Sequence, residues 1–149
     1  MNSTFVSLIA LLLSLGSSAQ EAPPPRLALI VHPDSGVTTL SSSDAINIFM
    51  GRYRKLPSGA VATPIDINEH SEERRQFYAQ VVRKDLATVD AYWARLVFSG
   101  QTSPPLKVPD SRTAVDLVAG NRTAVAYVDH AVVDSRVRIV MLIEPDPVR

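Results

Sequence analysis

The residues with the clearest potential for chemistry lie in one short polar segment, which runs from Asp66 to Arg75. An apolar run leads into it and Ser71 begins a helix, so the first backbone N–H groups of that helix lack partners within it. Such N–H groups attract anions, and the Ser71 hydroxyl would add one more donor. Arg74 or Arg75 could then reach back and hold an oxyanion through two parallel hydrogen bonds. The segment therefore predicts a binding site for a small anion.

The same segment has a second interpretation, in which no ligand binds. Glu72 and Glu73 place two carboxylates in the first turn, where they interact favourably with the helix dipole and repel an incoming anion. The segment would then be a well-capped surface helix whose glutamates and arginines pair three residues apart. The sequence leaves both interpretations open.

A basic stretch, Arg52-Tyr-Arg-Lys55, is the second place where charged and aromatic side chains come together. It could contact phosphate groups, but it is short and has no basic neighbours in the sequence, which favours a solvated connection between two elements. The whole chain of 149 residues has 15 Lys and Arg against 15 Asp and Glu, so its formal net charge is zero. This balance excludes a generally basic nucleic-acid-binding protein.

The sequence contains no pattern that predicts catalysis, a metal site or a cofactor. It has no cysteine, and therefore no disulfide-linked partner, no thiolate ligand and no cysteine nucleophile. Its three histidines, His32, His70 and His130, are not spaced as metal ligands on one helix or hairpin. No G-x-S-x-G pattern marks a hydrolase nucleophile. We therefore expect a binding protein rather than an enzyme.

Hydrophobic patterns and capping residues predict the elements that must position these side chains. Strands separated by helices favour one α/β domain, with a mostly parallel or mixed sheet flanked by helices. Pro64 would lie in an edge strand, because proline cannot donate to a sheet. Tyr92 and Trp93 would pack a helix onto the sheet. In chain order we expect a strand over 26–32, a helix over 41–50, a strand over 61–67, a helix from 71, a helix over 86–98, a loop over 101–109, a helix over 111–119, and strands over 123–128 and 137–143.

The first residues predict an export signal rather than part of that domain. Residues 1–20 carry no charged side chain, and an apolar run of eleven residues ends at Leu15. Eleven helical residues span about 16 Å, roughly half of a bilayer core, which disfavours an uncleaved membrane anchor. We expect cleavage between Ala19 and Gln20 and an exported, periplasmic protein. The expected parts are a signal peptide over 1–19, a proline-rich leader over 20–25, a domain over 26–143 and a flexible tail over 144–149.

Several segments, taken in order, resemble the phosphate-type substrate-binding proteins of ABC importers, which have the type 2 periplasmic-binding fold. The resemblance covers about residues 26–143 and implies one lobe of that fold, since family members clamp phosphate between two lobes in a longer chain. It rests on Leu40-Ser41…Asp44…Ile48-Phe49-Met50-Gly51-Arg52, on Ser71…Phe77-Tyr78, on Ala91-Tyr92-Trp93…Phe98-Ser99-Gly100, and on Ala124-Val-Ala-Tyr-Val128.

The resemblance also implies site residues and partners. Glu69 and Ser71 fit the acidic and serine positions of the family's anion loop, Ile67 stands near its arginine position, and Arg74 is the candidate substitute for that arginine. The implied function is binding of a small anion such as phosphate, weakly or with a partner, in ABC-type uptake through a membrane transporter. The alternative is a non-enzymatic interaction module that kept the fold without the ligand clamp and serves a membrane sensor, a receptor or a secretion complex. The implied ligand-binding residues are Glu69, Ser71, Arg74 and Arg75.

Overall fold

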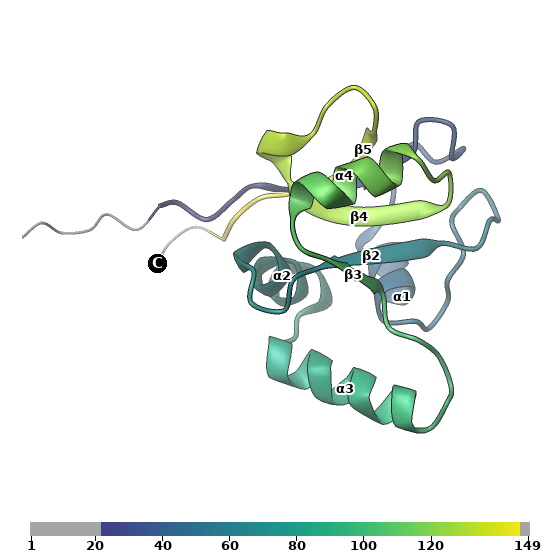
Figure 1. Cartoon of the computed structure of the whole chain (residues 1–149), viewed down its shortest axis with the longest axis vertical. Helices are drawn as coiled ribbons and strands as arrows, with labels where there is room; N and C mark the ends of the chain where they lie inside the picture. The colour runs from purple at the N-terminus through teal and green to yellow at the C-terminus, as the bar shows by residue number, and fades with distance from the viewer. Residues whose placement is uncertain (1–21, 147–149) are drawn as a thin grey trace, which may run out of the picture.

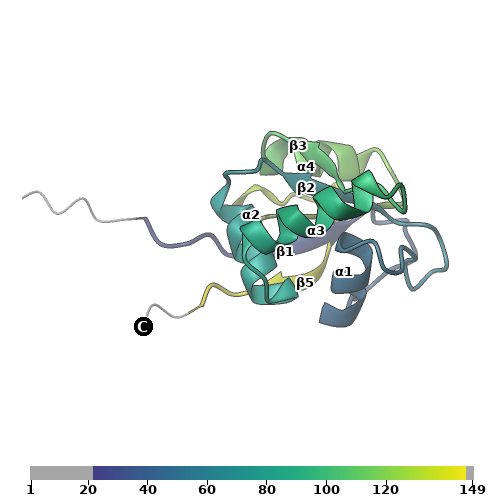
Figure 2. The ribbon, with the colours of Figure 1, turned by 90° about the horizontal axis from the view of Figure 1, so that it is seen from below.

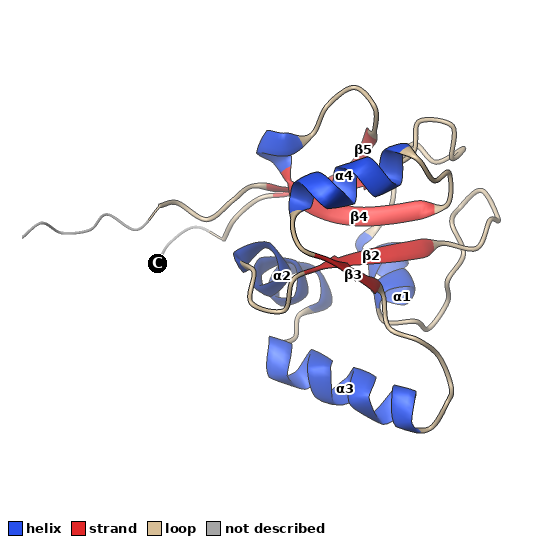
Figure 3. Ribbon diagram, in the orientation of Figure 1, coloured by secondary structure: helices blue, strands red, loops and turns tan. Residues whose placement is uncertain are grey.

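The fold is built around β1 (Leu27–Val31), a strand of five apolar residues that is buried along its whole length. In this computed structural model, which describes residues 22–146, β1 lies between β4 (Ala124–Asp129) and β5 (Arg138–Ile143), and both pairings are antiparallel. β2 (Thr63–Ile67) runs parallel to β4 on one side and to β3 (Leu106–Val108) on the other. The result is a five-stranded mixed sheet in the order β3-β2-β4-β1-β5 (Figures 1 and 3).

Helices cover both faces of this sheet. One face carries α4 (Ser111–Ala119), which packs mainly on β4. The other face carries α1 (Ser42–Phe49), α2 (Glu72–Phe77) and a π-helical turn, η1 (Tyr78–Val82) (Figures 1 and 2). The predicted fold class, a mixed α/β sheet flanked by helices, is confirmed. Two further elements are α3 (Leu86–Phe98) and the short 3-10 helix η2 (His130–Val132).

An aromatic cluster fixes α1 and α2 against the sheet. Phe77 of α2 stacks on Tyr127 of β4 with ring centroids 4.2 Å apart, and Phe49 of α1 meets the edge of the Phe77 ring at 4.8 Å. All three side chains are fully buried. Because aromatic pairs of this geometry add to the gain from burying apolar area, the cluster holds α2 in one position on the sheet. It thereby places the polar segment between β2 and α2.

Two expectations about the sheet are wrong. Residues 106–108, which we expect in a loop, form β3, because three residues near prolines are too few to show a hydrophobic pattern. β2 is an inner strand despite Pro64. The Thr63 N–H donates to the Thr123 carbonyl at 2.8 Å, so the next nitrogen points away from β4, and β3 begins only opposite Ile65. Pro64 therefore removes no hydrogen bond from the sheet.

The helix α3 lies beyond the β3 edge of the sheet and not on its face (Figures 1 and 2). Tyr92 and Trp93, which we expect against the sheet, contact the loop after α1 instead. The Tyr92 hydroxyl donates to the Met50 carbonyl at 2.7 Å, and the Trp93 ring presses against the backbone of Gly51. Only Val89 and Trp93 are buried in α3, so this helix exposes most of its surface.

The two ends of the folded part lie side by side. Leu27 of β1 is opposite Ile143 of β5, and Arg26 forms an ion pair with Glu144. The expected signal peptide, residues 1–19, lies outside the described residues. Ala22 to Pro25 of the expected leader form no helix or strand. Within residues 22–146, no helix is long and apolar enough to cross a membrane.

Candidate functional site

The predicted helix start between β2 and α2 is present, but its donors are used within the chain. Ser71 is the N-cap, and its Oγ accepts a hydrogen bond from the Arg74 N–H at 3.1 Å. Glu72 and Glu73 occupy the first turn of α2. Glu72 forms an ion pair with Arg75 three residues later, and both side chains are largely exposed. These contacts match the ligand-free interpretation of the segment, a capped helix with paired side chains.

Arg74 is the centre of a buried charge network. Its side chain is 1% exposed, so it does not reach into solvent. Its Nε donates to Asp66 Oδ2 at 3.1 Å, and its Nη2 donates to Asp90 Oδ1 at 2.7 Å. The guanidinium carbon also lies 5.3 Å from the centre of the Tyr78 ring. Arg74 therefore joins α2 to β2 and α3, and two carboxylates balance its charge.

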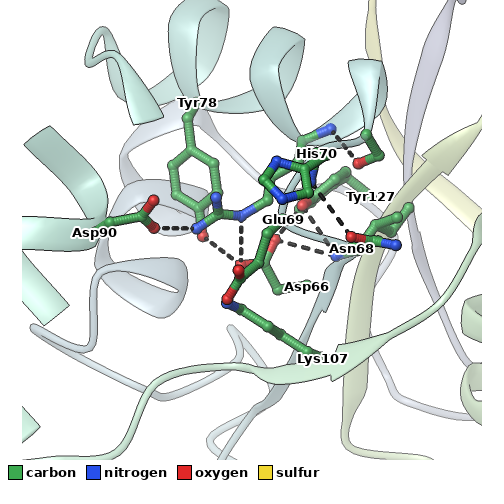
Figure 4. Close-up of polar contacts among 11 residues, drawn as sticks. Asp66, Asn68, Glu69, His70, Tyr78, Asp90, Lys107 and Tyr127 are labelled. Carbon is green, nitrogen blue, oxygen red and sulfur yellow. Dashed lines mark hydrogen bonds and ion pairs between the residues drawn. The ribbon is translucent and has the colours of Figure 1, made fainter. Parts of the chain in front are cut away.

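Asp66 is the second member of this network and is 2% exposed. It extends from β2 toward α2, where the hydroxyls of Tyr78 and Tyr127 both donate to its carboxylate (Figure 4). The Tyr127 hydroxyl in turn accepts the Ile67 N–H at 3.1 Å. A buried carboxylate is tolerated only when it is paired and hydrogen-bonded, and the arginine and the two tyrosines satisfy this condition.

The environment of this network shifts the titration of its members. Burial raises the pKa of both tyrosines well above the usual value, and the nearby Asp66 charge raises it further. Burial alone would lower the pKa of Arg74, but its hydrogen bonds and ion pairs with Asp90 and Asp66 outweigh burial and raise it. At neutral pH the tyrosines thus keep their protons and Arg74 keeps its charge. Neither the two tyrosines nor Arg74 would therefore exchange a proton at neutral pH in the way a general acid or base does.

A second ion pair closes the site on its outer side. Glu69, which follows β2, pairs with Lys107 of β3 (Figure 4). Both side chains are substantially exposed. The hydrogen bond from Lys107 lowers the pKa of Glu69 below its usual value, and the positive charge of Lys107 lowers it further. The pair spans the two neighbouring strands at their carboxyl ends, where open α/β sheets commonly bind ligands.

A cavity of about 340 Å³ lies between these residues and α3. Its wall carries three carboxylates and two cations, and each of these cations is already paired with at least one of the carboxylates. The wall is therefore negative overall, which opposes entry of an anion. The lining residues are Asp66, Glu69, Arg74, Asp90, Trp93, Pro104 and Lys107.

The structure brings only some of the predicted ligand residues together. Glu69 and Arg74 line the same cavity, whereas Ser71 and Arg75 do not. That these four residues bind an anion stays a prediction. Within residues 22–146, no group of three or more His, Asp or Glu side chains could hold a metal ion.

Sequence reasoning missed Asp66 and Asp90 as partners of Arg74, and Tyr127 as a partner of Asp66. One signal could have found Asp66, because it stands between Ile65 and Ile67 in an apolar strand. A carboxylate in such a position must be buried with a cation. The contribution of Asp90 depends on how α3 is placed, which the local sequence does not encode.

Comparison with known proteins identifies this fold. No protein-family model and no curated protein sequence matches the chain. A structure from Clostridium perfringens, assigned to the phosphate ABC transporter substrate-binding proteins and containing bound phosphate, matches with a TM-score of 0.63 and 22% identity over 78% of this chain and 44% of that chain. This chain has the fold of one lobe of a phosphate-type substrate-binding protein. The resemblance expected from the sequence is thus confirmed at the level of the fold.

Two further structures give the same result. An ABC-type phosphate transport receptor from Vibrio cholerae matches with a TM-score of 0.61 and 17% identity, over 78% of this chain and 45% of that chain. PstS from Borrelia burgdorferi matches with a TM-score of 0.59 and 10% identity, over 78% of this chain and 46% of that chain. The chain therefore spans less than half the length of each of these three proteins.

Proposed function

We propose that this protein is an exported, non-enzymatic interaction module that uses one lobe of the phosphate-binding-protein fold to contact a partner protein, such as a membrane sensor, a receptor or a component of a secretion complex. One observation carries this proposal. The arginine best placed to hold an anion, Arg74, is buried between Asp66 and Asp90. A guanidinium that is already balanced by two carboxylates has little attraction left for a third anion.

The rest of the site supports the same conclusion. The Ser71 hydroxyl caps α2, and Lys107 is paired with Glu69, so these two further donors also have partners. The fold matches less than half of each similar phosphate-binding protein. A single lobe with its donors occupied offers a stable surface rather than a closed ligand pocket.

The second candidate function is weak or partner-assisted binding of a small anion such as phosphate in ABC-type uptake. Arg74 Nη1 favours it, because this buried nitrogen has no hydrogen-bond partner among the described residues. The Clostridium perfringens protein of the same fold contains bound phosphate. In this candidate, a partner that covers the cavity would supply the remaining donors and reposition the Asp90 carboxylate, which is half-exposed.

Calorimetric titration of the purified protein with inorganic phosphate separates the two candidates. The interaction module predicts no saturable heat up to millimolar phosphate, in the wild type and in Ser71→Ala and Arg75→Ala alike. Saturable heat in the wild type would overturn the proposal and favour anion binding, and its loss in Ser71→Ala but not in the exposed Arg75→Ala variant would assign the anion to the start of α2. Since removing a helix cap costs about 1 kcal/mol of stability, thermal melting must show that Ser71→Ala is folded at the titration temperature.

The export component has its own test. Expression of the full chain in a bacterial host, followed by fractionation and intact mass measurement, should give a periplasmic protein that lacks residues 1–19. A full-length protein that remains in the cytoplasm would contradict this component and leave the interaction proposal standing.

A further inference from the structure

Two sets of cations near α3 differ in their ion pairing. In the β2–α2 region each cation that lines the cavity has a carboxylate partner. Among the described residues, six other cations near α3 form no ion pair, and they come from the loop after α1, from the segment between η1 and α3, and from the last turn of α3. These unpaired cations are Arg52, Arg54, Lys55, Arg83, Lys84 and Arg95.

The fold brings the two sequence segments of this group together. The Tyr92 hydroxyl donates to the Met50 carbonyl, and the Arg54 guanidinium carbon lies 5.7 Å from the centre of the Trp93 ring. Gly51 makes this approach possible, because a Cβ there would lie 2.8 Å from Trp93 Cη2. The basic stretch from Arg52 to Lys55 thus lies beside α3, whose one basic residue is Arg95. We name the surface formed by residues 52–55 and the exposed side of α3 the basic face.

A shallow groove of about 510 Å³ runs along the basic face. Its lining combines two alanines with two cations, Lys84 and Arg95, and contains no carboxylate. The Arg95 guanidinium carbon lies 5.9 Å from the centre of the Tyr92 ring, which orients its charge beside the groove. The lining residues are Lys84, Ala87, Thr88, Ala91, Tyr92 and Arg95.

An exposed apolar side chain, that of Phe98, lies on the same side of α3 as the groove residues. Thr88, Ala91, Arg95 and Phe98 follow one another at intervals of three or four residues, so they share one side of α3. Phe98 is 96% exposed, although a phenylalanine is normally covered. Unpaired arginine beside exposed aromatic residues is the composition that protein interfaces favour.

We infer that the basic face binds an acidic segment of a partner protein, whose carboxylates contact Lys84 and Arg95 and whose apolar side chain covers Phe98. The inference rests on the proposed function, since it names the surface and the partner chemistry that an interaction module requires. Charge complementarity supports it, because Lys84 and Arg95 line a groove that has no carboxylate, and neither forms an ion pair, so both attract a carboxylate-rich partner. A groove with an apolar residue at one end fits a polypeptide segment better than it fits a flat lipid surface.

Fluorescence anisotropy with labelled poly-L-glutamate as the probe tests the charge component. The full protein should bind the probe at low salt and release it in concentrated sodium chloride. The double variant Lys84→Glu/Arg95→Glu should weaken binding by about tenfold or more. The matched control, Arg112→Glu/Arg122→Glu, makes the same change in net charge at exposed positions outside the basic face and should bind within about twofold of the wild type.

The apolar component needs a second probe. A labelled peptide that alternates Glu with Leu should bind more tightly than poly-L-glutamate, and Phe98→Ser should remove that advantage. Circular dichroism and thermal melting verify that each variant is folded, as expected for exposed positions.

Each other outcome overturns the inference. The first is equal loss of binding in the two double variants, which would show an effect of net charge alone. The second is binding of vesicles rich in phosphatidylglycerol, but of neither probe, which would assign the basic face to a membrane. The third is no binding of either peptide. If phosphate titration meanwhile shows no binding, the interaction module survives and its contact surface lies elsewhere, whereas phosphate binding would remove the proposed function itself.

Discussion

The β2–α2 network and the basic face use charge in opposite ways. In the network, Arg74 and Asp66 are almost completely buried and each is held by more than one partner. On the basic face, Lys84 and Arg95 are exposed and form no ion pair with any described residue. The segment with the richest chemistry in the sequence therefore stabilises the fold, whereas Lys84 and Arg95, which the sequence does not mark, present charge without a partner. Five predictions test this contrast.

The largest effect is expected from Arg74→Met. Removing the buried guanidinium leaves Asp66 charged and buried without its main counter-ion, so the free energy of unfolding should fall by about 3–5 kcal/mol. Urea denaturation measures this loss. The control is Arg75→Met, which breaks only the exposed pair with Glu72 and should change stability by less than about 0.5 kcal/mol. Similar losses in the two variants would show that the network is not the main electrostatic support.

A smaller loss is expected from Gly51→Ala, which disturbs the base of the basic face. Gly51 has a φ of +67°, and its added Cβ would lie 2.8 Å from Trp93. Backbone strain and overpacking together should lower stability by about 2–4 kcal/mol in thermal or urea unfolding. Gly59→Ala is the matched control, because φ is +88° there but no atom lies within 4 Å of the added Cβ. If the two variants lost equal stability, the contact with Trp93 would contribute nothing.

The third prediction concerns Tyr127→Phe. The hydroxyl donates to Asp66 and accepts from the Ile67 N–H, so its removal takes one hydrogen bond from each of two buried polar groups, although Ile67 still donates to Asp66. We expect a loss of about 1–3 kcal/mol in the free energy of unfolding. Tyr53→Phe, at an exposed tyrosine, should leave stability unchanged. Unchanged stability in Tyr127→Phe would show that water or another side chain replaces the hydroxyl.

The same tyrosines predict how stability depends on pH. Burial, reinforced by the Asp66 charge, raises the pKa of Tyr78 and Tyr127 in the folded state. Because their pKa is raised, the contribution of these tyrosines to stability is complete below the pKa of an unfolded tyrosine, about 10, and is lost as the pH rises above it. Urea unfolding measured from about pH 8 to about pH 11, a range around that value, should show the free energy of unfolding falling at the alkaline end. The fall should be shallower in Tyr127→Phe, and an identical slope would contradict the assignment.

The smallest effect on stability is expected at the basic face. Lys84→Gln combined with Arg95→Gln removes two unpaired, exposed charges, so the free energy of unfolding should change by less than about 0.5 kcal/mol. Thermal unfolding at low and at high salt checks this result. A large loss would indicate that these cations support the fold and would remove the contrast with Arg74.

The sequence predicts most of this fold because its elements carry strong local signals. The apolar run of β1 and the Ser41 capping box of α1 are readable without tertiary information. β3 and the inner position of β2 are not, since they depend on which strands pair. The three residues of β3 become a strand only because Ile65 to Ile67 lie beside them.

The site is less predictable than the fold for a similar reason. The cap at Ser71 and the pair of Glu72 with Arg75 follow from local spacing. The network around Arg74 depends on Asp90, sixteen positions along the chain, and on Tyr127 of the neighbouring strand β4, which bonds Asp66. Likewise, the basic stretch after α1 acquires its neighbours only when Trp93 packs on Gly51. Local patterns therefore identify charged groups but not their partners.

The pairing of Leu27 with Ile143 gives this unit the geometry of a domain that can be inserted into a loop of another protein. Since β1 begins next to the end of β5, a host protein could receive the whole unit at one surface loop without stretching its own backbone. By the same logic, a short peptide could join the two ends and new termini could be opened elsewhere. A domain whose ends adjoin in this way can be inserted into different host proteins as one folded unit.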